Sequence, residues 1–225
     1  MLFRSARRAL FRDRRDAGRK LADALAGLVL ERPVLLALPR GGVPVGYEIA
    51  RRLAAPLDLA LVRKIGAPGC PELGLGAVVA GAHPELVLND EIIEAVGPSR
   101  AYLMEEQSRQ LAELERRRIL YRGDRPPPEI AGRDVLVVDD GIATGGSIRA
   151  VLRAVAQARP ARRIVAVPVA PAETVAALER EAELVICLAT PDPFRAVGAA
   201  YEDFAQTSDE EVVALLRELD RRSAA

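Results

Sequence analysis

Residues 135–147 bring together groups that could bind a phosphate, and they read VLVVDDGIATGGS. An apolar run ends in two acids, and a short stretch of small residues then leads into a helical pattern. The first amides of a helix have no intrahelical partner and lie at the positive end of the helix dipole, so they attract a phosphate. Gly145 and Gly146 let the backbone approach it, and the hydroxyls of Thr144 and Ser147 can donate hydrogen bonds to it.

The two acids, Asp139 and Asp140, need a partner other than the phosphate, because a bound anion only a few residues away would repel them. Sugar hydroxyls fit, and so does a magnesium ion shared between hydroxyls and a second phosphate group. The strand, the acids, the loop and the helix therefore predict a site for a sugar that carries a phosphate. The alternative is that the acids only end a strand and cap a turn.

Two other phosphate-binding motifs are excluded by the residues present. A P-loop needs a lysine followed by Ser or Thr after its glycines, and the only lysines, Lys20 and Lys64, lie in no such context. Gly41, Gly42 and Gly46 are not spaced as the Gly-x-Gly-x-x-Gly of dinucleotide-binding proteins. Neither motif explains the segment.

The apolar pattern predicts how these residues are positioned. Short, nearly continuous apolar runs alternate with stretches of helical spacing, which is typical of a parallel sheet covered by helices on both faces. The expected strands are 34–38, 57–62, 135–138, 164–169 and 184–188, and the expected helices are 16–30, 45–53, 147–158, 172–181 and a last one that begins with the capping box at 208–211. We therefore predict an α/β fold.

Ligands in such folds bind at the carboxyl ends of the strands, so the loops that follow strands carry the function. These loops are 39–42, 64–76, 139–147 and 189–200. In the first, Arg40 with Gly41 and Gly42 could direct a guanidinium and two amides at a diphosphate, or form an ordinary turn. The second is dense in glycine and proline and is expected to be a mobile loop without regular structure.

Residues 89–120 read as helical, but the charged stretch 105–118 offers too few apolar positions for a buried helix. We expect a single domain over 1–225, with a mainly helical peripheral insertion at about 83–130.

The 13 residues 135–147 resemble the phosphoribosyl pyrophosphate signature of type I phosphoribosyltransferases. The resemblance implies the fold of that family, with a helical insertion and a small hood beside the central sheet. It also implies that Asp139 and Asp140 hold the ribose 2- and 3-hydroxyls, that Mg²⁺ binds to these acids or through those hydroxyls, and that residues 143–147 wrap the 5-phosphate. The substrate-binding set is then Asp139, Asp140, Gly141, Ala143, Thr144, Gly145, Gly146 and Ser147.

The same resemblance assigns roles to two other loops. The loop 39–42, with Arg40, Gly41 and Gly42, falls where the family binds pyrophosphate, and the loop 64–76 falls where it has a flexible catalytic loop. Arg63 and Lys64 end a strand beside that second loop, and Lys64, the scarcer kind of cation in this chain, could contact the pyrophosphate. The expected catalytic residues are Lys64, Arg63 and Asp140. The alternative for Arg63 and Lys64 is a solvated pair at a strand end.

The reaction that the resemblance implies is displacement of pyrophosphate from C1 of the ribose by a nitrogen nucleophile. The acceptor would be covered by a hood near 191–207, where Phe194 either stacks on it or belongs to the core. Relatives that act on 6-oxopurines carry an acid at the position of Ala143, so a 6-oxopurine acceptor is disfavoured.

A different hypothesis keeps the fold without catalysis: a regulator that senses the sugar phosphate or a nucleotide and binds nucleic acid. Its contacts would be the arginine run 116–118 and the arginine-rich residues 1–20. For residues 1–20 the pattern favours an exposed lead-in to a helix over a nucleic-acid arm or a transit peptide. The chain has 32 basic and 32 acidic residues, and this balance argues against nucleic acid as a partner.

Composition points to a soluble protein. With 225 residues, 50% of them hydrophobic, the chain can bury a self-supporting core, and no apolar run approaches the roughly 18 residues needed to cross a bilayer. Cys70, Cys187 and His83 are too few for a disulfide framework or a zinc site. We expect a cytoplasmic protein that binds phosphoribosyl pyrophosphate and a small-molecule acceptor and no membrane. Homo-oligomer formation is left open.

Overall fold

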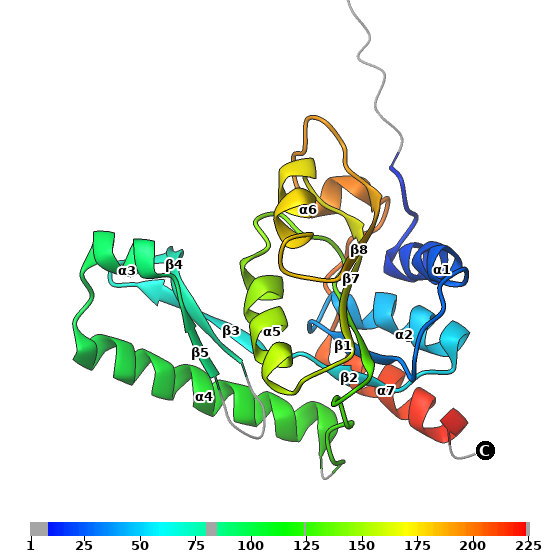
Figure 1. Ribbon diagram of the computed structural model, residues 1–225, viewed down its shortest axis with the longest axis horizontal. Helices are drawn as coiled ribbons and strands as arrows, with labels where there is room; N and C mark the ends of the chain where they lie inside the picture. Colours follow the sequence, from blue (N-terminus) through cyan, green and yellow to red (C-terminus); the bar gives the residue numbers. More distant parts are fainter. Residues whose placement is uncertain (1–8, 80–84, 124, 224–225) are drawn as a thin grey trace, which may run out of the picture.

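The computed structural model describes residues 9–79, 85–123 and 125–223. Its centre is a sheet in the order β2-β1-β6-β7-β8, and every neighbouring pair of strands in it is parallel (Figure 1). The strands are β1 (Val34–Ala37), β2 (Leu57–Leu59), β6 (Asp134–Val138), β7 (Arg162–Val169) and β8 (Leu184–Ala189). The predicted parallel sheet is confirmed.

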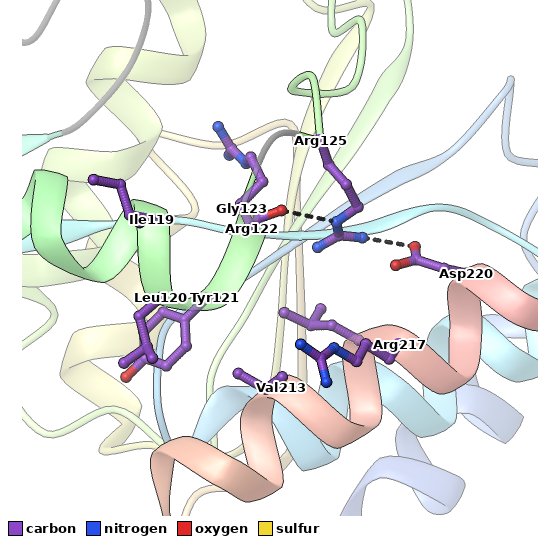
Figure 2. Close-up of a pocket in the computed structure, with 10 residues that line it drawn as sticks. Ile119, Leu120, Tyr121, Arg122, Gly123, Arg125, Val213, Arg217 and Asp220 are labelled. Carbon is purple, nitrogen blue, oxygen red and sulfur yellow. Dashed lines mark hydrogen bonds and ion pairs between the residues drawn. The ribbon is translucent and has the colours of Figure 1, made fainter.

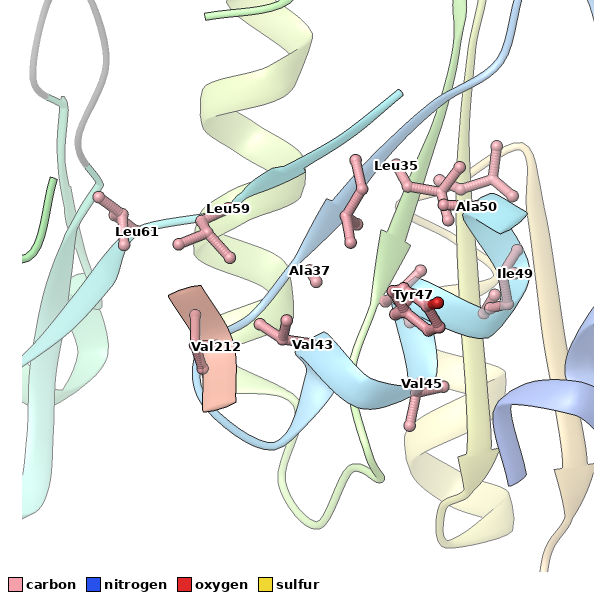
Figure 3. Packing of buried hydrophobic residues seen from close by; sticks show 14 of the residues in the cluster. Leu35, Ala37, Val43, Val45, Tyr47, Ile49, Ala50, Leu59, Leu61 and Val212 are labelled. Atoms are coloured by element: carbon pink, nitrogen blue, oxygen red, sulfur yellow. The ribbon is translucent and has the colours of Figure 1, made fainter. Parts of the chain in front are cut away.

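Helices cover both faces of this sheet, as expected for strands that are apolar on both sides. In β1, Leu35 and Ala37 belong to one hydrophobic core, whereas Val34 and Leu36 belong to the other. Figure 3 shows the first core, where Leu35 and Ala37 lie with side chains of α2 and with Val212 of α7. The helices around the sheet are α1 (Arg14–Leu25), α2 (Gly42–Leu53), α5 (Gly146–Gln157), α6 (Ala172–Leu178) and α7 (Asp209–Ser223).

Local polar side chains set the start of two helices. At α7, Ser208 Oγ accepts a hydrogen bond of 3.1 Å from the Glu211 amide, as the capping box predicts. The first helix begins at Arg14, earlier than predicted, because Asp13 Oδ1 accepts a bond of 2.7 Å from the Asp16 amide.

A second, antiparallel sheet in the order β3-β4-β5 extends away from the first (Figure 1). It consists of β3 (Val62–Ala67), β4 (Cys70–Val79) and β5 (Glu85–Leu88), so the prediction of a loop without regular structure at 64–76 is wrong. The glycines serve the hairpin instead of breaking it. Gly69 turns the chain at a φ of 71°, the register shifts on either side of Gly66, and a Cβ on Gly76 would lie 2.2 Å from the Val87 carbonyl oxygen.

Residues 89–120, predicted to be helical, fall in α3 (Asp90–Val96) and α4 (Arg100–Arg122), which pack on the second sheet. The buried face of α4 contains Glu106 and Gln110 as well as Leu114 and Tyr121. These two polar side chains bond to each other, with Gln110 Nε2 donating to Glu106 Oε1 at 2.6 Å. A helix can thus be buried along a face whose apolar pattern is sparse.

Within the part of the chain that the structure describes, no helix is long and apolar enough to span a membrane. His83 and the first eight residues, which include Arg4, Arg7 and Arg8, lie outside the described residues.

Candidate functional site

The loops after β1 and β6 lie against each other at the carboxyl end of the central sheet. A Cβ added to Gly41 would lie 2.0 Å from Asp140 Oδ2. One added to Gly42 would lie 2.7 Å from the Val138 carbonyl oxygen. Only glycine permits so close an approach. The structure therefore brings the residues predicted for pyrophosphate next to those predicted for ribose.

The two carboxylates are held by different partners. Asp139 Oδ1 accepts a hydrogen bond of 2.9 Å from the Asp140 amide. Asp140 Oδ2 accepts one of 2.7 Å from Arg14 Nε of α1, and the two side chains are 14% and 12% exposed. The side chains of Asp139 and Asp140 also lie within hydrogen-bonding reach of each other, so a ligand would meet the two acids as one group.

Burial and mutual repulsion act on both acids. Burial raises the pKa of Asp139 well above its ordinary value, and the neighbouring charge of Asp140 raises it further. Burial also raises the pKa of Asp140, while the bond from Arg14 opposes that rise. A ligand that brings hydroxyl donors or a cation would stabilise the ionised pair.

The loop into α5 leaves its amides accessible. Gly145 occupies the N-cap at a φ of 79° and offers no side chain to the first turn. Thr144, Gly146 and Ser147 are exposed, and a Cβ added to Gly146 would meet no atom within 4 Å. The helix start is thus open to an anion, as the phosphate prediction requires.

Two hydrogen bonds hold this loop in place from the neighbouring strand and helix. The Ile142 amide donates to the Val169 carbonyl at 2.9 Å, and Thr174 Oγ1 donates to the Ala143 carbonyl at 2.8 Å. Because both bonds use inward groups of the loop, they fix the loop without covering its exposed amides.

A short 3-10 helix, η1 (Val197–Ala200), lies in the segment after β8 and contacts the loop that carries the acid pair. A Cβ on Gly141 would lie 2.4 Å from Val197 Cγ1, so glycine is required for this contact. The Tyr201 hydroxyl donates to the Asp140 carbonyl oxygen, and burial raises the pKa of that hydroxyl. Sequence reasoning did not identify Tyr201 as a site residue, although the aromatic content of 191–207 pointed to this segment.

Arg14 is the second residue that sequence reasoning missed. Besides its bond to Asp140, its Nη1 donates to the Ala205 carbonyl at 2.6 Å, and its guanidinium carbon lies 3.8 Å from the centre of the Phe204 ring. Nothing in the sequence distinguishes Arg14 from the other N-terminal arginines, because its partners are about 126 and 191 residues away along the chain.

Arg40, predicted to bind a diphosphate, points toward the start of α7. Its Nη1 lies 3.5 Å from Asp209 Oδ1, and that oxygen also accepts a bond of 2.5 Å from the Tyr121 hydroxyl. Burial, followed by the bond to Asp209, raises the pKa of Tyr121 to about 12. An anion bound at the loop would compete with Asp209 for Arg40.

Arg63 and Lys64, predicted to be catalytic, lie on β3 of the second sheet. Arg63 Nε donates a bond of 2.9 Å to Gln110 Oε1 of α4. The Lys64 side chain passes over Gly74, where an added Cβ would lie 2.7 Å from Lys64 Cε. The structure does not group these two side chains with the acid pair, and their catalytic role stays a prediction.

Phe194, predicted to stack on an acceptor, packs as a partly buried side chain against a small hydrophobic cluster. The buried members of that cluster are Phe11, Ala17, Val169, Ala200 and Tyr201. Stacking by Phe194 also stays a prediction.

Two surface cavities lie near these elements. One of about 260 Å³ separates the end of α4 from α7, and at its edge Arg125 Nη1 donates to Asp220 Oδ1 at 2.6 Å (Figure 2). Another of about 250 Å³ is lined by Arg14, Pro44 and Thr207 among others, and so adjoins the Arg14–Asp140 pair.

Known proteins resemble the chain along most of its length. The family described as the phosphoribosyl transferase domain matches residues 12–201. Two curated Mycobacterium tuberculosis proteins, from strains CDC 1551 / Oshkosh and ATCC 25618 / H37Rv, have names that assign them provisionally as phosphoribosyl transferases. Each is 47% identical over 208 residues, which is 92% of this chain and 46% of the relative, so the chain spans about half the length of these proteins.

A solved structure is also similar. The crystal structure of the protein TT1426 from Thermus thermophilus superimposes with a TM-score of 0.78 at 50% sequence identity, covering 93% of this chain and 98% of the other. The similarity therefore extends over the central sheet and the second sheet together.

Proposed function

The chain belongs to the phosphoribosyltransferase family, and on that premise we propose that it binds 5-phosphoribosyl 1-pyrophosphate and transfers the phosphoribosyl group to a nitrogen nucleophile. The observation that carries this proposal is the packing of Gly41 against the Asp140 carboxylate, next to the uncapped start of α5. A diphosphate site, a pair of acids and a phosphate site in that order match a ribose that carries anions at C1 and C5.

Each group of residues would bind a different part of the substrate. Asp139 and Asp140 accept hydrogen bonds from the ribose hydroxyls, and the amides at 144–147 hold the 5-phosphate. Arg40 and the amides of Gly41 and Gly42 take the diphosphate. Binding would then replace the contact of Arg40 with Asp209, which is 3.5 Å long and partly exposed.

The donor set fits a magnesium ion that arrives with the substrate. Among residues 9–79, 85–123 and 125–223, no group of three or more His, Cys, Asp or Glu side chains could hold a metal by itself. Mg²⁺ commonly binds through one or two carboxylates together with oxygens of the substrate, and Asp139 and Asp140 can supply that share. Bound there, magnesium would offset the charge that develops on the leaving diphosphate.

Catalysis in this proposal is mainly electrostatic. The fixed amides and Arg40 hold the two anionic ends of the substrate, so C1 is presented to the acceptor in one geometry. The segment 197–207, which contacts Gly141 and the Asp140 carbonyl through Val197 and Tyr201, would exclude water that could otherwise attack the ribose. Ala143 has no basic side chain, so the acceptor nitrogen must be nucleophilic without a base at that position, which disfavours 6-oxopurines.

The test is pyrophosphate release in the presence of magnesium, screened over a library of nucleobases and amines. Release with at least one acceptor supports the proposal. The chain could instead bind phosphoribosyl pyrophosphate, release no pyrophosphate with any acceptor, and bind nucleic acid with an affinity that falls steeply with salt. That result would favour a regulator that senses the sugar phosphate.

Gly146→Ala should weaken the binding of ribose 5-phosphate by roughly tenfold without loss of stability. The new methyl group meets no protein atom within 4 Å, and alanine is favoured over glycine in a helix, so the unfolding temperature should stay the same or rise. The methyl group would, however, obstruct an anion that approaches the helix amides. Calorimetric affinity and thermal unfolding measure the two effects, with Gly27→Ala as a control in equally open space. Unchanged affinity would place the phosphate elsewhere.

Lys64→Ala should lower turnover by about 100-fold while changing substrate affinity much less, if Lys64 contacts the pyrophosphate only as it leaves. This role requires the side chain to move from its position over Gly74. Rates of pyrophosphate release and calorimetric affinity separate the two quantities, and Arg52→Ala on an exposed part of α2 is the control. Equal losses of turnover and of affinity would contradict a catalytic role for Lys64.

A further inference from the structure

Arg14 joins two parts of the site that are far apart in the sequence. It donates hydrogen bonds to the Asp140 carboxylate and to the Ala205 carbonyl, and its guanidinium lies against the face of Phe204. With only 12% of its side chain exposed, it is held between Asp140 and residues 204–205. A guanidinium at this place can set the spacing of both.

The backbone around Arg14 is fixed on both sides. The chain before it pairs with the segment 197–207, since the Phe11 amide donates to the Ala200 carbonyl at 3.0 Å and the Asp203 amide donates to the Arg12 carbonyl at 2.8 Å. The helix that follows Arg14 is capped by Asp13. The guanidinium therefore comes to Asp140 from a rigid support, as a preorganised contact requires.

We propose that Arg14 is a positioning residue of the site: it orients the Asp140 carboxylate toward the ribose and holds the segment 203–207 over it. This inference rests on the proposed function. By engaging Oδ2 at 2.7 Å, Arg14 fixes the orientation of the Asp140 carboxylate, which lies against that of Asp139, so that the ribose hydroxyls meet the acid pair in one geometry. Arginine suits both tasks because its planar fork donates in two directions and stacks on an aromatic ring, whereas lysine supplies a point charge.

Docking of α1 does not depend on Arg14. Ala17, Leu21 and Leu25 are fully buried in the cores. On another side of the helix, Arg15 Nε binds the buried Glu48 carboxylate at 2.7 Å. Truncation of Arg14 should therefore leave the helix in place and change the site.

The test compares a phosphate probe that carries a sugar with one that does not. Ribose 5-phosphate has the hydroxyls that Asp140 would bind, whereas inorganic phosphate can use only the amides at the start of α5. Arg14→Ala should weaken ribose 5-phosphate and phosphoribosyl pyrophosphate by roughly 10- to 100-fold and leave inorganic phosphate within about twofold of wild type. The affinity of Arg14→Lys for ribose 5-phosphate should lie between those of the wild type and Arg14→Ala. Methylguanidinium in the buffer should restore part of the affinity that Arg14→Ala loses.

Arg12→Gln is the matched control, because Arg12 lies two residues away with a side chain that is 69% exposed and pairs with Asp16. An equal loss for both probes, or no loss for either, would overturn the positioning role. If Arg14→Ala does not fold, Arg14→Lys decides by the same comparison. Failure of the wild-type chain to bind phosphoribosyl pyrophosphate would overturn the proposed function, and this inference with it.

Discussion

The double variant Asp139→Asn, Asp140→Asn should lose magnesium-dependent binding of phosphoribosyl pyrophosphate by more than about 100-fold. Hydrogen bonds from a ligand to a charged group contribute about 1.5–3 kcal/mol each, and this variant weakens at least two of them as well as the attraction of magnesium. Isothermal titration calorimetry with and without magnesium measures the loss.

The same variant should keep its fold. Because the pKa values of both acids are raised in the folded state, their ionisation near pH 7 costs folding free energy, and the neutral amides remove that cost. Against this gain, Arg14 loses an ionised partner and keeps its contacts with Ala205 and Phe204. The unfolding temperature should thus stay close to that of the wild type.

The control is the double variant Asp90→Asn, Glu91→Gln, which neutralises two adjacent exposed acids at the start of α3. Its affinity for phosphoribosyl pyrophosphate should match the wild type. Unchanged affinity in the Asp139, Asp140 variant would contradict the assignment of these acids to the ribose and the metal.

Gly41→Ala should reduce affinity for phosphoribosyl pyrophosphate by about 100-fold and destabilise the chain by about 1–3 kcal/mol. Its Cβ would lie 2.0 Å from Asp140 Oδ2, the oxygen that Arg14 binds, so the carboxylate or the loop has to move. Either movement separates the loop 39–42 from the acid pair and so disturbs two parts of the proposed site at once.

Calorimetry and chemical denaturation measure the two effects of Gly41→Ala. Gly27→Ala is the matched control, since a Cβ there meets nothing within 4 Å, and it should behave like the wild type. Wild-type affinity in Gly41→Ala would mean that the loop 39–42 takes no part in binding.

Local sequence determined the central sheet and placed one half of the proposed site. A strand buried on both faces of a parallel sheet must be apolar at nearly every position, so runs such as 135–138 are visible without any knowledge of their neighbours. The loop at 139–147 joins a strand directly to a helix, so its acids, glycines and hydroxyls fall at the carboxyl end of the sheet from local connectivity alone.

Tertiary structure decided the contacts between distant segments. The hairpin at 62–79 forms because its glycines permit a bulge and a close approach to β5, and neither effect can be read from glycine content. Arg14 and Tyr201 reach Asp140 from opposite ends of the chain, and Arg63 turns to Gln110. Hydrophobic periodicity reports which face of an element is buried, but the partner of a polar side chain depends on the order of the strands and on where the chain returns to the sheet.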